Sequence, residues 1–121
     1  MADSPLITKS KEFALQIIKV CNYVKQSKKE SVLTNQLIRS GTSVGANIRE
    51  AFYGHGTADF IAKLQIALKE CYETEYWLEL FMKSDILNRE SAVDLYNQCG
   101  TIRRILIASI NTAKENCDGK R

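Results

Sequence analysis

Four cysteines and one histidine are the side chains best suited to bind a metal ion or to act as nucleophiles, but their spacing favours neither role. No two cysteines form the Cys-x-x-Cys pair that a zinc ribbon or a thiol redox motif needs. Three of them fall on apolar helical stripes, and we interpret these as small buried hydrophobic residues in a reducing compartment. The cysteines are Cys21, Cys71, Cys99 and Cys117.

The other groups that could act in catalysis are isolated. His55 lies in a Gly-His-Gly loop, and the sequence has no Glu-x-x-His pair from which a helical bundle could build a di-iron site. Glu75 falls on the apolar side of an expected helix; it is a functional carboxylate with a raised pKa, the partner of a basic or hydroxyl group, or a residue at the edge of the apolar stripe. Glycine-rich phosphate loops and nucleophile elbows are absent from the sequence. We therefore expect no enzymatic activity, no metal and no cofactor.

Charge is the next feature with chemical meaning. The chain carries a net charge of only +3, yet residues 9–29 hold six lysines against one glutamate, and residues 57–83 hold five acids against three lysines. A basic surface of this kind suits phosphate contacts, although a lysine-rich helix can also be simply solvated. The sequence contains no recognisable nucleic-acid-binding module. The candidate phosphate contacts are Lys25, Lys28, Lys29, Arg39, Arg49, Arg103 and Arg104.

Apolar periodicity predicts the elements that must position these side chains. With 121 residues, 45% of them apolar, one proline and six glycines, the chain favours a single all-α domain over residues 1–121. Four helices are expected, over about 10–26, 31–53, 57–83 and 88–116. Their short connections predict an antiparallel, up-down-up-down four-helix bundle. The sequence shows neither a membrane span nor a signal peptide, so we expect a cytoplasmic protein without membrane contact.

Helix boundaries and stripes can be predicted in part. Thr57 and Asp59 are expected to begin the third helix, and Asn88 is expected to cap the fourth. The apolar stripe predicted for the third helix consists of Phe60, Leu64, Leu68, Cys71, Leu78 and Met82.

The segment RSGTSVGANIREA, residues 39–51, places two glycines inside the second expected helix. Each glycine weakens a helix by about 0.5–1 kcal/mol relative to alanine, so a compensating gain is needed. Gly41 lies on the core stripe and Gly45 at its edge, where a missing side chain lets another helix approach. The opposite face is small and polar, and we interpret it as a second packing surface. It consists of Arg39, Ser43, Ala46, Asn47 and Glu50.

The third expected helix is apolar on two sides. Away from its core stripe it carries Ile66, Trp77, Leu80 and Phe81 among Glu70 and Glu73. One bundle core covers one such side well, and an exposed aromatic patch marks an association site. Homo-oligomerisation is the prediction that follows; the alternative is that the wide stripe is buried more deeply within one bundle.

The segments QLIRSGTSVGANIREA and DFIAKLQIALKECYETEYWL carry a resemblance. They are similar to the central signature of a four-helix-bundle family named for proteins encoded in intervening sequences of bacterial 23S ribosomal RNA genes. The resemblance is strongest over residues 36–80. The matching positions are Arg39, Ser40, Gly41, Thr42, Ser43, Gly45, Ala46, Asn47, Glu50 and Ala51.

The resemblance implies an antiparallel four-helix bundle that assembles into a ring-shaped pentamer. A related protein, the accessory variability protein of diversity-generating retroelements, is a basic pentamer that binds nucleic acid and a reverse transcriptase. Two functions therefore remain open for this chain. The first is an oligomer that binds RNA or DNA through phosphate groups; the second is a scaffold whose repeated surfaces bind a protein partner.

Overall fold

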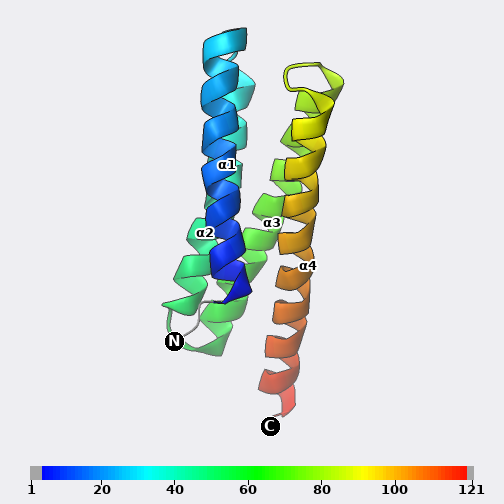
Figure 1. Cartoon of the computed structure of the whole chain (residues 1–121). Helices are drawn as coiled ribbons and strands as arrows, with labels where there is room; N and C mark the ends of the chain where they lie inside the picture. Colours follow the sequence, from blue (N-terminus) through cyan, green and yellow to red (C-terminus); the bar gives the residue numbers. More distant parts are fainter. Residues whose placement is uncertain (1–3, 120–121) are drawn as a thin grey trace.

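The computed structural model describes residues 4–119 as four helices joined by short turns. Successive helices run in opposite directions (Figure 1), so the prediction of an all-α, antiparallel four-helix bundle is confirmed. No strand occurs within residues 4–119, and none of their helices combines the length and apolar character needed to cross a bilayer. The helices are α1 (Pro5–Lys28), α2 (Val32–Phe52), α3 (Gly56–Lys83) and α4 (Arg89–Gly119).

The starts of α1, α3 and α4 agree only in part with the local sequence signals. The predicted start of α1 near residue 10 is wrong, because Ser4 caps the helix by accepting a hydrogen bond from the Leu6 N–H at 3.2 Å, with proline at the first helical position. The Asn88 cap of α4 is confirmed, since its side-chain oxygen accepts from the Ser91 N–H at 2.9 Å. At the start of α3, Thr57 is not the cap; the Asp59 carboxylate accepts from the His55 N–H at 3.3 Å.

The start of α2 is held by a carboxylate that precedes the helix. Glu30 accepts hydrogen bonds from the backbone N–H groups of Leu33 and Thr34, at 3.0 and 2.9 Å. Partial desolvation opposes ionisation of this group, but these hydrogen bonds outweigh it and lower the pKa of Glu30. An ionised carboxylate at a helix N-terminus also interacts favourably with the helix dipole. Glu30 thus stabilises the turn between α1 and α2.

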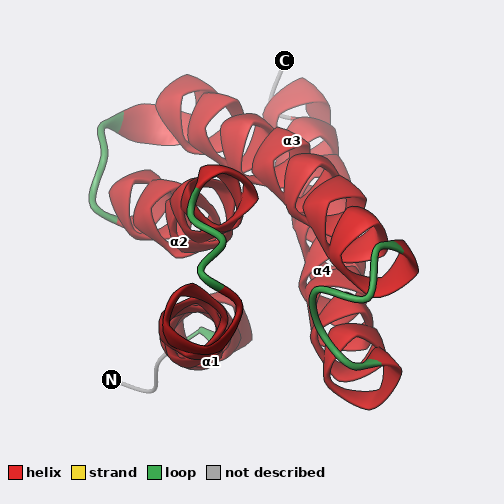
Figure 2. Cartoon of the chain, turned by 90° about the horizontal axis from the view of Figure 1, so that it is seen from above, coloured by secondary structure: helices red, strands yellow, loops and turns green. Residues whose placement is uncertain are grey.

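The four helices do not pack equally. Viewed from above, the helices follow one another around the bundle, with α2 between α1 and α3 and with α4 between α3 and α1 (Figure 2). The α1–α4 seam is the most sparsely packed of the four. One hydrogen bond that crosses it joins the Gln98 Nε2 to the Gln16 Oε1 at 2.9 Å. The central α2–α3 seam is therefore the best-packed part of the bundle.

Large apolar side chains from all four helices form one core. Burial of this apolar area supplies most of the stability of such a bundle. Members that are essentially inaccessible to solvent include Phe13, Ile17, Leu37, Ile48, Leu64, Leu78, Phe81, Leu95, Ile102 and Leu106.

The buried stripe of α3 differs from the predicted one. Its buried residues alternate at spacings of three and four, which is the heptad pattern of supercoiled helices. Phe60, Leu68 and Met82 are therefore only half-buried. Phe81 follows Leu78 by three residues and is fully buried, so its predicted position on the outer side of the helix is wrong. The wider stripe is thus partly covered within the bundle itself.

Both glycines of α2 face a neighbouring helix, as predicted, and the structure shows that this helix is α1. A Cβ atom on Gly41 would lie 3.0 Å from the Ile17 Cγ2, closer than two such carbons approach without a shift of the neighbour. A Cβ on Gly45 would lie 3.4 Å from the Ser10 carbonyl oxygen, an ordinary contact. The close approach of α1 to α2 therefore depends on Gly41 more than on Gly45.

Replacing Gly41 with leucine should lower the free energy of unfolding by about 1–3 kcal/mol or more, because the new side chain would be forced against Ile17. Thermal unfolding followed by far-UV circular dichroism measures the effect. Gly45→Ala is the matched control and should leave stability unchanged or raise it by about 0.5–1 kcal/mol, since it removes a helical glycine without a clash. An unchanged melting temperature for Gly41→Leu would contradict the packing described.

Candidate functional site

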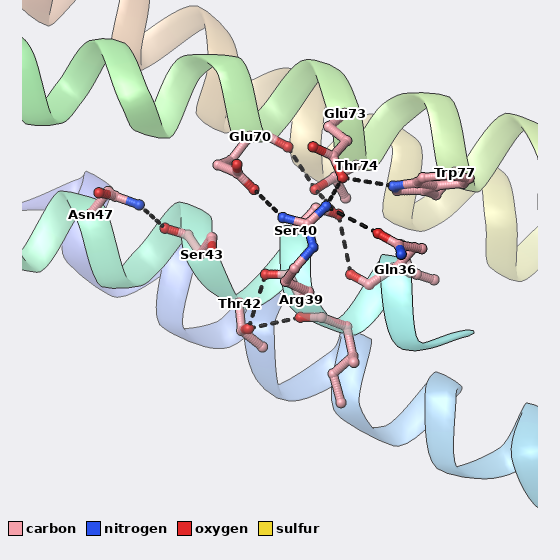
Figure 3. A network of polar contacts seen from close by, with 12 residues as sticks. Gln36, Arg39, Ser40, Thr42, Ser43, Asn47, Glu70, Glu73, Thr74 and Trp77 are labelled. Carbon is pink, nitrogen blue, oxygen red and sulfur yellow. Dashed lines mark hydrogen bonds and ion pairs between the residues drawn. The ribbon is translucent and has the colours of Figure 1, made fainter. Parts of the chain in front are cut away.

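A network of charged side chains joins α2 to α3 on one side of their seam (Figure 3). The guanidinium of Arg39 forms ion pairs with the carboxylates of Glu70 and Glu73, the first at 3.5 Å. It also donates to the Gln36 side-chain oxygen at 3.2 Å. Glu73 accepts a further hydrogen bond, at 3.0 Å, from the indole N–H of Trp77. The ion pairs of Arg39 therefore link α2 to α3 within one chain.

Beneath this network lies a buried contact between two hydroxyl groups. The Oγ of Ser40 and the Oγ1 of Thr74 lie 3.0 Å apart, and both residues are fully buried. Each hydroxyl is also within hydrogen-bond distance of a carbonyl of its own helix, from Leu37 and Glu70. These contacts satisfy polar groups that would otherwise be costly to bury. The small polar residues of α2 thus serve its close packing against α3.

The predicted outer face of α2 is divided by this arrangement. Asn47 and Ser43 are half-buried, and the Asn47 amide donates to the Ser43 carbonyl at 2.9 Å. Glu50 forms an ion pair with Lys63 of α3 at 3.1 Å. Of the five residues, Arg39 and Glu50 contact α3 of the same chain, and Ala46 is exposed toward α1.

Ala46 lines a groove of about 340 Å³ between the outer faces of α1 and α2. Small and apolar side chains form most of its walls, and two cationic side chains, Lys11 and Arg49, also border it. Such a groove offers apolar contact area at its floor and positive charge at its edge. The lining residues are Ile7, Ser10, Lys11, Ala14, Thr42, Gly45, Ala46 and Arg49.

The outer side of α3 keeps part of its predicted apolar character. Ile66 is exposed, whereas Trp77 and Leu80 are half-buried. Two residues that were not predicted, Tyr72 and Tyr76, are also exposed there. The one-turn spacing between these tyrosines could have indicated a shared helix face.

The seven predicted phosphate contacts do not form one patch. Lys28 and Lys29 are exposed and Lys25 is half-buried at the α1–α2 end of the bundle (Figure 1). Arg49 lies near the opposite end of α2, and Arg104 is exposed on α4. Arg39 and the remaining arginine, Arg103, are engaged in ion pairs with glutamates. The structure thus brings together only the three lysines.

Two further cations lie at the same end of the bundle as these lysines and were not predicted. Lys83 ends α3 and Arg89 begins α4, so both stand at the α3–α4 turn, which Figure 1 shows at the end that also carries the α1–α2 turn. The predicted alternation of helix directions could have placed these two cations beside the lysines, since the second and fourth helices of such a bundle begin at the same end.

The carboxylate of Glu75 is buried and paired with a basic group, which confirms one of its interpretations. It accepts a hydrogen bond from the Arg103 Nε at 2.8 Å, and the Arg103 guanidinium lies 5.6 Å from the centre of the Tyr72 ring. The hydrogen bond to Glu75 raises the pKa of Arg103, with partial desolvation acting against it. Desolvation, followed by the charges of Glu75 and Glu79, raises the pKa of Tyr96 nearby. This pair joins α3 to α4 and leaves Glu75 inaccessible to a substrate.

Three of the four cysteines match the interpretation as small core residues. Cys21, Cys71 and Cys99 are buried and Cys117 is exposed. A hydrogen bond to Cys71 and burial raise the pKa of Cys99, and burial raises the pKa of Cys21 to about 11 despite the nearby Lys25. Protonated thiols are poor nucleophiles. Residues 4–119 contain no cluster of histidine, cysteine and acidic side chains that could hold a metal ion.

Replacing Arg103 with methionine should lower the free energy of unfolding by about 1–3 kcal/mol, because Glu75 would remain buried without its cation. Arg104→Met is the matched control; Arg104 is exposed and donates only to the Thr101 hydroxyl among the described contacts, so a change within about 0.5 kcal/mol is expected. Adding Glu75→Met to Arg103→Met should restore part of the stability. Equal effects of the two arginine variants in urea unfolding would argue against a structural role for the pair.

Comparison with known proteins assigns the chain to a family. The family described as 23S rRNA-intervening sequence protein matches residues 3–108. A crystal structure of a protein with unknown function from the S23 ribosomal protein family of Bacteroides thetaiotaomicron is similar, with 46% sequence identity and a TM-score of 0.85; the match covers 87% of this chain and 97% of that one. No curated protein matches the chain. The chain belongs to the 23S rRNA-intervening sequence protein family.

Proposed function

We propose that the protein is a non-enzymatic oligomer that binds nucleic acid, RNA or DNA, through phosphate contacts. The observation that carries this proposal is the division of charge between the two helical hairpins. Residues 5–52, which include α1 and α2, contain eight lysines and arginines against three glutamates. Residues 56–119, which include α3 and α4, contain seven against ten acidic residues. A positive surface of this kind attracts phosphates at long range.

The lysines at the α1–α2 turn are the best phosphate contacts on this hairpin. Lys28 and Lys29 are exposed, and neither they nor Lys25 belong to an ion pair among the described residues. The adjacent carboxylate of Glu30 is already bound by the backbone N–H groups at the start of α2. The three ammonium groups are therefore available to an external anion.

Self-assembly belongs to the same proposal. The small-residue groove beside Ala46 and the apolar side of α3 with Trp77 are both accessible on one chain. Repetition of the basic α1–α2 end around a ring, which we expect to be a pentamer, would multiply a modest positive charge into a continuous field. Three buried free cysteines are consistent with a reducing, cytoplasmic setting.

A protein-binding scaffold is the alternative function, and one observation favours it. Tyr72 and Tyr76 are exposed on α3, and Tyr76 packs edge-to-face against Trp77 with ring centres 5.2 Å apart. Tyrosine and tryptophan are enriched where proteins bind one another. On this alternative, the ring presents repeated aromatic surfaces to a partner and nucleic acid is incidental.

Replacing Lys25, Lys28 and Lys29 together with glutamine should weaken RNA binding irrespective of sequence and should flatten its salt dependence. The reason is that fewer counterions are released from the RNA when fewer of its phosphates are neutralised by lysines. Fluorescence anisotropy of a labelled RNA over a series of salt concentrations measures both quantities.

The matched control for the lysine variant changes Lys63, Lys69 and Lys114 to glutamine, which removes the same charge from the second hairpin. This control should retain most of the affinity. If the unmodified protein does not bind RNA even at low salt, the nucleic-acid proposal fails and the scaffold alternative remains.

Replacing Ala46 with tryptophan should disrupt assembly while leaving the fold intact. The new side chain would fill the groove and force apart two packed surfaces, at a cost of about 1–3 kcal/mol for each repeated contact. Light scattering should then report a smaller species with unchanged helical content. Ala108→Trp, at an exposed alanine of α4, should keep the native mass. A full-sized Ala46→Trp assembly would exclude this face from the contact.

A further inference from the structure

One exposed aromatic side chain lies close to the proposed phosphate contacts. Tyr23 of α1 is 56% exposed, so much of its ring is open to solvent. Lys19 precedes it by one helical turn and Ser27 follows it by one turn, and both are exposed. Gln26 is exposed on the same side. The ring thus stands free on a polar and cationic surface.

This part of α1 contains no negative side chain. Between Glu12 and Glu30 the sequence has four lysines and no acidic residue, and the segment from Lys19 to Lys28 spans about 14 Å of helix. The Glu30 carboxylate is bound by backbone N–H groups of α2. An anion can therefore approach Tyr23 along α1 without meeting a free carboxylate of that helix.

The neighbouring helix across the seam leaves the ring accessible. Asp94 of α4 is tied to Gln98, which also donates to Gln16 of α1. Gln16 precedes Tyr23 by seven residues, about 10 Å along the helix. The carboxylate of Asp94 is thus engaged by the same Gln98 amide that binds Gln16.

An exposed aromatic ring among cations has a specific consequence for nucleic-acid binding. A base can stack on such a ring only if one of its faces is free, which is the case in a single strand. In a duplex both faces of each internal base are covered, so the ring would add nothing to the phosphate contacts. Stacking of this kind does not depend strongly on base identity.

We infer that this surface binds single-stranded nucleic acid, with one base stacked on Tyr23 and neighbouring phosphates held by Lys19 on the same face and by the lysines of the α1–α2 turn. The inference rests on the proposed function, because it names the class of nucleic acid that the basic hairpin binds. The site is the exposed side of α1 from Lys19 to the α1–α2 turn.

Three labelled probes test the site: a single-stranded RNA, the same strand annealed to its complement, and a strand of equal length without bases. Tyr23→Ala should weaken binding of the single strand by about 5- to 100-fold, the decrease expected for one stacked base. It should leave binding of the duplex and of the strand without bases unchanged, because both depend on the lysines alone. Tyr23→Phe should bind all three probes as the unmodified protein does, because the aromatic face is retained.

Tyr76→Ala is the matched control, since Tyr76 is 54% exposed, about as much as Tyr23, but lies on the predominantly acidic helix α3. It should not affect any probe. If Tyr23→Ala leaves single-strand binding unchanged while the triple lysine variant weakens it, the stacking site is wrong and the proposed function stands. An equal decrease for all three probes would also overturn stacking. Absence of binding by the unmodified protein to every probe would overturn both.

Discussion

The close packing of α2 against two neighbours is the constraint on which the rest of the bundle depends. On one side Gly41 leaves space for Ile17 of α1, and on the other Ser40 meets Thr74 of α3 through buried hydroxyl groups. Large side chains at these positions would separate the helices, since interiors tolerate little excess volume. The small side chains within residues 39–51 therefore allow helices of the same chain to pack closely. Their cost in helix propensity is offset by contact with two helices at once.

Much of the fold was predictable because its signals are local and repeated. Apolar periodicity identified four helices, and short connections implied their directions. The errors arose where a different constraint decided the outcome. The early start of α1 depends on Ser4 and Pro5, outside the apolar stripe. The burial of Phe81 follows from a heptad spacing that a straight helical stripe does not reproduce.

The candidate site was less predictable, because ion pairs between helices decide which charges remain available. Arg39 and Arg103 have the same residue type as Arg104, yet the first two are engaged by carboxylates of α3. Sequence distance gives no direct indication of such pairing. The lysine cluster was predictable because its members are adjacent along the chain, at the end of one helix. The exposed tyrosines of α3 gave a weaker signal, because a phenol is part apolar and part polar and does not stand out in an apolar pattern.

The sparsely packed α1–α4 seam gives the bundle an uneven resistance to thermal fluctuation. Local opening is least costly where few buried apolar contacts are broken, so the first and last helices should part more readily than the central pair. Amide hydrogens at the centre of α2 and α3 should therefore exchange with solvent more slowly than those on the sides of α1 and α4 that meet at this seam. The seam between the N-terminal and C-terminal helices is thus the part of the bundle that opens at the lowest free-energy cost, and the α2–α3 seam is the part that opens at the highest.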